Sequence, residues 1–268
     1  MDADDCWARA GTVRIRLLGP VELACGTRPV PVTGRRQLRV VAALALEAGR
    51  VLSTAGLIAS LWADEPPRTA ARQLQTSVWM IRRALASVGA PQCVVRSTPA
   101  GYLLDPAHYE LDSDRFRHAV LTARELQRDG RLAQARARVD EGLALWRGPA
   151  LGAAAGAGLQ PRARRLEEER VFALEQRAGL DLALGRHETA IGELLDLIAQ
   201  HPLREAAYAD LMLALYRSGR QSDALAVYRR AQRVLADELA VRPGPRLAGL
   251  ERAILRQDES LLAGAAVP

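Results

Sequence analysis

The sequence predicts a mainly helical protein with a small β part at its N-terminal end and an all-helical second region. Three observations indicate this fold class. Apolar residues alternate with arginine over residues 13–17, as in a strand with one solvent-exposed face. Apolar residues then recur at helical spacing in three stretches between residues 35 and 88. Beyond residue 112, the pattern G-R-x-x-x-A occurs three times, which suggests repeated helix pairs.

The composition favours closely packed helices and a negatively charged partner. The chain has 268 residues, enough for two domains, and only 4% are aromatic, so alanine, leucine and valine must build the interior. All 37 basic residues are arginine. Residues 1–111 hold 13 arginines and 9 acidic residues, so most of the net charge of +6 lies in this shorter part. Such an excess favours a polyanion without identifying it.

Cysteine usage and the N-terminus predict a cytoplasmic protein without a membrane segment. Cys6, Cys25 and Cys93 are scattered and odd in number, which favours reduced thiols over a disulfide framework or a metal site. Residues 1–12 are acidic at their start and lack the apolar core of a signal peptide, so we expect a disordered leader. The longest apolar run, residues 40–46, is too short to span a membrane.

The predicted β segments are short and flank a group of helices. Alternation and turn residues predict strands at residues 13–17, 21–23 and 29–32, which together suggest a small antiparallel sheet. A hairpin is predicted from residues 92–96 and 101–104. Between these β parts lie three predicted helices, so the order is strands, helix, helix, long helix, hairpin. That order is typical of a winged helix-turn-helix domain.

Capping residues set the predicted bounds of these three helices. Gly49 ends the first helix, and Ser53 or Thr54 caps the second. The third helix begins at Thr69, whose hydroxyl can cap its first turn, and ends near Gly89.

The long third helix has two unlike faces. Its apolar stripe comprises Leu74, Val78, Ile81 and Leu85. The opposite face carries polar, basic and aromatic side chains: Thr69, Arg72, Thr76, Trp79 and Arg83, with Arg68 and Gln73 beside them. From residue 66 to residue 104 there are five arginines and no acidic residue. This pattern suits a helix in a DNA major groove, although taken alone it equally suits a solvated amphipathic helix.

Arginines also crowd the start of the first helix. Arg35, Arg36 and Arg39 lie in its first turn, where positive charge is unfavourable unless an anion is nearby. A DNA phosphate could be this anion, and ordinary solvated surface is the other interpretation.

Several motifs in this region resemble a known family. They are L-W-x-D-E-P-P at residues 61–67, L-Q-x-x-V at 74–78, I-R-R-A-L at 81–85 and G-Y-x-L at 101–104. Residues 13–105 thereby resemble the DNA-binding domain of the Streptomyces antibiotic regulatory proteins, an OmpR-type winged helix. Two features depart from the family pattern. Thr98 lies at the tip of the hairpin, where a basic residue is common, and Trp79 and Met80 replace small polar or basic residues.

The second region is predicted to be a tetratricopeptide-like solenoid. Asp112 is a suitable cap for its first helix. The three repeat patterns begin at Gly130, Gly185 and Gly219. The last two are 34 residues apart, the length of a tetratricopeptide repeat, and the first interval is 21 residues longer, which predicts an insertion around residues 145–161. Each glycine is expected to end one helix, and each alanine to allow close packing of the next. Coincidental Gly-Arg turns are the alternative.

This region also resembles the second domain of the same family, the bacterial transcriptional activation domain, over residues 112–262, followed by a tail at 263–268. The motifs are L-W-R-G-P-A-L at 145–151, R-L-E-E-E-R at 165–170, H-P-L-R-E at 201–205, L-M-L-A-L-Y-R-S-G-R-Q-S-D-A-L at 211–225 and R-P-G-P-R-L at 242–247. The resemblance implies a transcriptional activator of a secondary-metabolite (antibiotic) gene cluster. It also implies a dimer on double-stranded DNA, bound to direct repeats near the promoter −35 region, that recruits RNA polymerase through its sigma factor.

In this interpretation the side chains have distinct roles. Arg72 suits guanine, Gln73 suits adenine, and Thr69 and Thr76 suit thymine methyls or phosphate. The remaining expected DNA contacts are Arg82 and Arg83 as phosphate anchors, Arg96 and Thr98 on the wing, and Arg36, Arg68 and Trp79. A tetratricopeptide scaffold whose winged helix does not bind DNA is the alternative, and ligand sensing by the helical region is a third interpretation.

The sequence lacks the common catalytic patterns. Without lysine there is no phosphate-binding G-x-x-x-x-G-K-[ST] loop, and neither G-x-S-x-G nor H-E-x-x-H occurs. We therefore expect no enzymatic activity, no cofactor and no metal.

Overall fold

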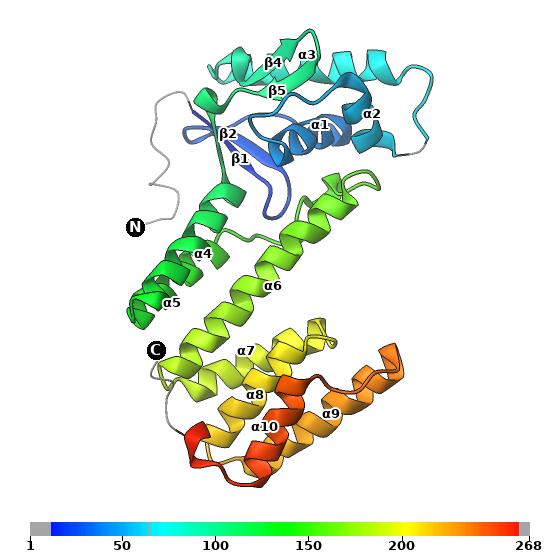
Figure 1. Ribbon diagram of the computed structural model, residues 1–268. Helices are drawn as coiled ribbons and strands as arrows, with labels where there is room; N and C mark the ends of the chain where they lie inside the picture. Colours follow the sequence, from blue (N-terminus) through cyan, green and yellow to red (C-terminus); the bar gives the residue numbers. More distant parts are fainter. Residues whose placement is uncertain (1–11, 64, 263–268) are drawn as a thin grey trace. The chain divides into compact units, whose positions relative to one another are not determined.

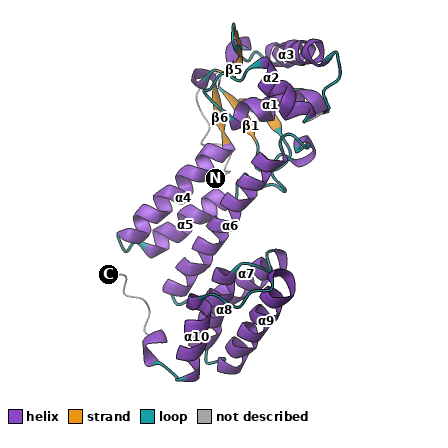
Figure 2. Cartoon of the chain, turned by 45° about the vertical axis from the view of Figure 1, so that its right-hand side comes forward, coloured by secondary structure: helices purple, strands orange, loops and turns teal. Residues whose placement is uncertain are grey.

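The structure is a computed structural model that describes residues 12–63 and 65–262. It is mainly helical with a small N-terminal β part, which confirms the predicted fold class (Figures 1 and 2). The chain forms two compact units. The N-terminal unit comprises the described residues up to His118 together with residues 144–168; the repeat unit comprises residues 119–143 and the chain from Glu169 onward. Residues 144–168, which the sequence places in the second region, thus group with the first. The predicted leader and tail lie almost entirely outside the described residues.

A four-stranded sheet begins the N-terminal unit, in the order β3-β2-β1-β6. Its strands are β1 (Val13–Arg16), β2 (Glu22–Cys25), β3 (Arg28–Pro29) and β6 (Tyr109–Leu111). The first three are antiparallel, as predicted, but β6 runs parallel to β1. The sequence pattern does not reveal β6, because residues 109–111 form a strand only by pairing with the free edge of β1. Strand β3 ends earlier than predicted, because prolines at 29 and 31 have no N–H to donate.

Three helices follow the sheet: α1 (Arg35–Leu46), α2 (Thr54–Trp62) and α3 (Ala70–Ser87). Ser53 caps α2, since its Oγ accepts the N–H of Gly56 at 3.0 Å. Thr69 occupies the N-cap position of α3, but its hydroxyl does not cap the helix. It accepts a hydrogen bond from Nε2 of Gln73 at 2.7 Å instead, so the predicted side-chain cap is wrong.

The predicted hairpin forms the wing, with strands β4 (Val95–Thr98) and β5 (Gly101–Leu104) paired antiparallel. Leu52, just before α2, extends this small sheet. It exchanges two backbone hydrogen bonds with Tyr102, at 2.8 and 2.9 Å. The wing is therefore joined to the start of α2 as well as to the end of α3.

The rest of the described chain contains seven α-helices, and Figure 1 shows α8, α9 and α10 packed side by side. They are α4 (Asp112–Arg128), α5 (Leu132–Leu143), α6 (Gln160–Ala183), α7 (His187–Gln200), α8 (Glu205–Arg217), α9 (Gln221–Leu239) and α10 (Pro245–Leu255). The three repeat glycines end α4, α6 and α8 with φ of 72–75°, a conformation that favours glycine. Each of these glycines lies five residues before an alanine of the next helix, and Ala135, Ala190 and Ala224 are all fully buried. The predicted roles of both residue types are confirmed.

Asp112 has a different role from the predicted cap. It is the first residue of α4, and its buried carboxylate accepts the N–H groups of Leu17 at 2.7 Å and Leu18 at 3.0 Å. Burial raises the pKa of Asp112, although these hydrogen bonds and the charge of Arg147 oppose the increase. The side chain thus secures the end of β1 to the start of α4.

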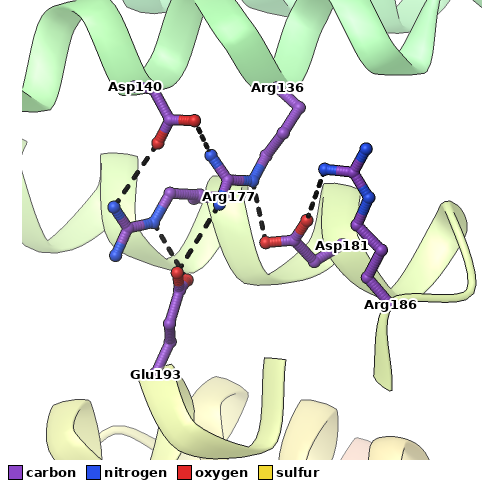
Figure 3. A network of polar contacts seen from close by, with 6 residues as sticks. All are labelled: Arg136, Asp140, Arg177, Asp181, Arg186 and Glu193. Atoms are coloured by element: carbon purple, nitrogen blue, oxygen red, sulfur yellow. Dashed lines mark hydrogen bonds and ion pairs between the residues drawn. The ribbon is translucent and has the colours of Figure 1, made fainter. Parts of the chain in front are cut away.

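An ion-pair network joins α5, α6 and α7 within the repeat unit (Figure 3). Arg136 donates from Nε to the fully buried Asp181 at 2.8 Å and also contacts Asp140 and Glu193. Arg177 pairs with Glu193 at 2.9 Å and with Asp140 at 3.5 Å. Because Asp181 is sealed from solvent, the arginine beside it compensates a charge that would otherwise be costly to bury.

Candidate nucleic-acid interface

Helix α3 is held from behind by an apolar core. Leu74, Ile81 and Leu85 are fully buried, and Val78 nearly so. They pack against α1 and α2, whose own buried residues include Val41. The core therefore fixes the rotation of α3 about its axis and directs the opposite face outward, as the sequence periodicity predicts.

The outward face of α3 carries the side chains that the sequence analysis selected. Its exposed members are Arg68 and Thr69, just before the helix, and Arg72, Thr76, Trp79 and Arg83 within it. Trp79 is 57% exposed, and the Arg83 guanidinium lies over its ring, 5.4 Å from the centroid. Thr76 donates its hydroxyl to the carbonyl of Arg72 at 3.0 Å. These contacts orient a basic and apolar surface toward solvent.

The start of α1 borders one side of this face. Arg36 and Gln37 line a groove together with Thr69, just before α3, and with the α3 residues Arg72, Gln73, Thr76, Ser77 and Met80. Gln37 donates from Nε2 to the sulfur of Met80 at 3.2 Å and so connects the two helices. The Arg36 guanidinium lies 5.5 Å from the centroid of the Trp62 ring. Gln37 was not among the predicted site residues, because no local pattern shows that the start of α1 meets the middle of α3.

The wing borders the other side, and Arg82 connects it to α3. Its Nε and Nη2 donate to the carbonyl of Val95 at 2.9 and 2.7 Å, and Nη2 also donates to Oγ of Ser97 at 2.9 Å. Arg82 thus contacts the wing strand in this structure, and its predicted role as a phosphate anchor stays a prediction. Ser97 is a second residue that the sequence analysis did not select.

The two predicted wing residues have intramolecular partners as well. Arg96 forms an ion pair with Asp105 at 3.1 Å, and the hydroxyl of Thr98 donates to the carbonyl of Gly101 at 3.3 Å. Arg96 remains more than half exposed. The structure thus places Arg96 and Thr98 on the wing, separate from the α3 face.

No described carboxylate compensates the positive charge on the α3 face. Over the described part of the chain, no carboxylate lies within ion-pair distance of Arg68, Arg72 or Arg83. Exposed arginines without acidic neighbours create a positive potential that attracts a polyanion. The same described residues contain no group of three or more histidine, cysteine or acidic side chains placed to hold a metal. Nor do they include a helix with the length and apolarity needed to cross a membrane.

Comparison with known proteins identifies the family. Residues 111–255 match the family model of the bacterial transcriptional activator domain, and residues 28–104 match that of the transcriptional regulatory protein C-terminal domain. The chain is 37% identical to the regulatory protein DnrI of Streptomyces peucetius, over 93% of this chain and 94% of DnrI. This chain belongs to the Streptomyces antibiotic regulatory protein family. It is therefore a transcriptional activator with an OmpR-type DNA-binding domain.

Other family relatives are larger. The regulatory protein AfsR of Streptomyces griseus is 37% identical over 95% of this chain, which spans only 26% of AfsR. A solved structure of Mycobacterium tuberculosis EmbR, in complex with a low-affinity phosphopeptide, superposes with a TM-score of 0.86 at 33% identity. That match covers 93% of this chain and 68% of the EmbR chain. The shared fold thus extends through both regions of this Streptomyces antibiotic regulatory protein.

The departures from the family pattern lie at exposed positions of α3 and at a half-buried position of the wing. Trp79 is exposed, and Met80 is 46% exposed beside it on α3. Thr98, at the tip of the wing, is half-buried. Because none of the three contributes to the apolar core, they vary the candidate interface of this family member without altering its fold.

Proposed function

We propose that this activator binds DNA sequence-specifically, with α3 in the major groove, and controls a secondary-metabolite (antibiotic) gene cluster. One observation carries the proposal: the outward face of α3 joins exposed polar side chains with arginines that form no ion pair with the carboxylates of residues 12–63 and 65–262, while its back is buried in a core. A rigid helix with this division has the shape and chemistry that major-groove readout requires. The protein would act at chromosomal DNA in the cytoplasm.

Phosphate contacts would set the position of the protein on the duplex. Arg36, Arg68 and Arg83 lie exposed at the start of α1, before α3 and near the end of α3. Each neutralised phosphate releases a bound counterion, so this part of the affinity falls as salt rises and is independent of base sequence.

Base contacts would then come from the middle of the α3 face. Arg72 can donate two hydrogen bonds to guanine, and Thr76 presents a methyl group suited to thymine. Gln73 suits adenine, although its amide now donates to Thr69 and would have to exchange that partner for the base. Trp79, stacked with Arg83, adds an apolar contact surface of a kind that the family pattern does not contain.

The family resemblance supports the remaining steps. Two protomers would bind head to tail on direct repeats about one helical turn apart, beside the promoter −35 region. The repeat unit would supply contacts to RNA polymerase, including its sigma factor, because stacked helix pairs provide extended protein-binding surfaces.

Footprinting on the promoters adjacent to the gene tests this function. We expect protection of two direct repeats, together with tighter binding to that region than to random DNA in gel shifts at rising salt concentration. Equal affinity for both DNAs at every salt concentration would contradict sequence-specific binding. Absence of binding to either would favour the tetratricopeptide scaffold in which the winged helix does not contact DNA.

A further inference from the structure

Residues 144–168 belong to the DNA-binding half of the molecule in space, although they lie within the stretch that matches the activator domain. We call these residues the inserted segment. Helix α5 ends at Leu143, and α6 begins at Gln160 and continues to Ala183. The inserted segment thus consists of the long connection between these helices and the first turns of α6.

The connection is joined to the end of β1 by main-chain hydrogen bonds. Arg147 donates its N–H to the carbonyl of Leu18 at 2.8 Å, and Leu151 donates to that of Leu17 at 2.9 Å. The Arg147 guanidinium also pairs with Glu22 at 2.8 Å. Leu151 and Leu159 are fully buried. The connection is therefore a packed part of the N-terminal unit and contributes to its core.

Gly158 brings the inserted segment against the last turn of α2. A Cβ atom at this position would lie 2.5 Å from the carbonyl oxygens of both Ala59 and Ser60. Carbon and oxygen atoms that are not bonded cannot approach so closely, so no larger residue fits unless the backbone moves. The glycine thus permits direct contact between the segment and the α2 backbone.

Arg162, one turn further along, connects the ends of two helices. Its Nη2 lies 3.1 Å from Oε1 of Glu47, the residue that caps the C-terminus of α1. Its Nη1 donates to Oγ of Ser60 at 3.3 Å, and that hydroxyl donates to the carbonyl of Gly56 within α2. One guanidinium therefore holds the C-terminal ends of α1 and α2 together. These two helices form the support on which α3 packs.

We propose that Gly158 and Arg162 clamp the helix-turn-helix from behind, and that Arg162 is a positioning residue for DNA binding. By fixing α2 against α1, Arg162 sets the surface on which α3 rests and so the presentation of Arg72 and Thr76. The affinity for DNA then depends on a segment encoded inside the activator region. The DNA-binding part of this inference rests on the proposed function, whereas the clamp itself does not.

Substitution of Arg162 in the full chain tests the clamp, with hydrogen exchange and DNA binding as readouts. In Arg162→Ala we expect amide exchange in α2 to accelerate by about tenfold, as expected when charge-assisted hydrogen bonds are lost. Affinity for the protected promoter region should fall about fivefold while the slope of log affinity against log salt stays unchanged, because Arg162 contacts no phosphate. Arg164→Ala is the matched control, since it removes the same charge from an exposed position on the same helix. It should change neither readout.

Two further variants keep the test decisive. Glu47→Gln preserves the shape of the acidic partner and should reproduce part of the faster exchange, even if Arg162→Ala fails to fold. Arg162→Glu combined with Glu47→Arg restores an ion pair and should recover wild-type exchange.

Unchanged α2 exchange in both Arg162→Ala and Glu47→Gln would overturn the clamp. A salt slope reduced by about one would overturn the positioning role, because it indicates a direct phosphate contact. If the wild-type protein shows no preference for the promoter, the proposed function fails, and α2 exchange still decides the clamp.

Discussion

Arginine is used in opposite ways on the α3 face and in the repeat unit. Arg68, Arg72 and Arg83 are exposed, and none of them forms an ion pair with a carboxylate in the described part of the chain. Arg136 is only 11% exposed and contacts three acidic side chains. In a chain without lysine, residue type alone cannot separate these two uses. The acidic partners distinguish the two uses. An arginine enclosed by carboxylates stabilises the fold, whereas an arginine without such partners is available to an external anion.

The largest expected effect comes from breaking the repeat-unit network. Replacing Arg136 with alanine leaves Asp181 buried without its main partner, which should destabilise the protein by about 3–5 kcal/mol. Urea unfolding measures this change. Arg138→Ala is the control, since Arg138 pairs with Glu141 at the exposed surface of the same helix and should cost less than about 1 kcal/mol. Equal losses of unfolding free energy in the two variants would show that the buried Arg136 pair stabilises the fold no more than the exposed Arg138 pair.

The next effect concerns specificity and should leave stability unaltered. Arg72→Ala should weaken binding to the promoter repeats by about 1–3 kcal/mol and relax one base position, with little change on random DNA. Competition gel shifts against single-base operator variants measure this. Arg28→Ala, which removes an exposed arginine from β3, should preserve the base preference. Equal loss on operator and random DNA would show that Arg72 contacts only the backbone.

Arg83 should behave as a phosphate contact. Its replacement with alanine should weaken binding to all DNA sequences similarly and lower the slope of log affinity against log salt by about one.

Arg82, the neighbouring residue, should instead act through the wing, and Arg82→Ala tests this role. It should loosen the wing, seen as faster amide exchange at residues 95–98, because Arg82 donates to Val95 and Ser97. Preserved wing exchange in Arg82→Ala would show that these bonds do not hold the wing.

The smallest expected effect is a pH dependence in the repeat unit. Burial and then the charge of Arg217 lower the pKa of His187 below its usual value, while Glu188 opposes them. The unfolded chain therefore binds more protons than the folded chain just below the usual histidine pKa, and stability should fall as the pH drops through about 6.5. Melting temperatures between pH 7.5 and 5.5 should show this decrease. His187→Gln should reduce it, and an identical decrease in the variant would exclude His187 as its source.

Local signals in the sequence predicted most of the fold. Gly130, Gly185 and Gly219 end helices because a turn requires their conformation, and apolar periodicity fixes which side of α3 is buried. The outward direction of these α3 side chains is observed, whereas their contacts to bases and phosphates stay predictions. Contacts between distant residues could not be predicted, because neither partner carries a local pattern. Examples are Asp112 with Leu17 and Gln37 with Met80.

The close contact of Gly158 with the α2 backbone limits how domains of different regulators can be combined in one chain. A chimera that takes the winged helix of one relative and everything after residue 111 from another would place a foreign inserted segment against native α2 carbonyls. Two sequences that evolved separately would then have to match at Ser60 and Glu47. A chimera should therefore acquire the promoter specificity of a paralogue when residues 144–168 are transferred together with the winged helix. These residues lie in the middle of the activator domain's sequence.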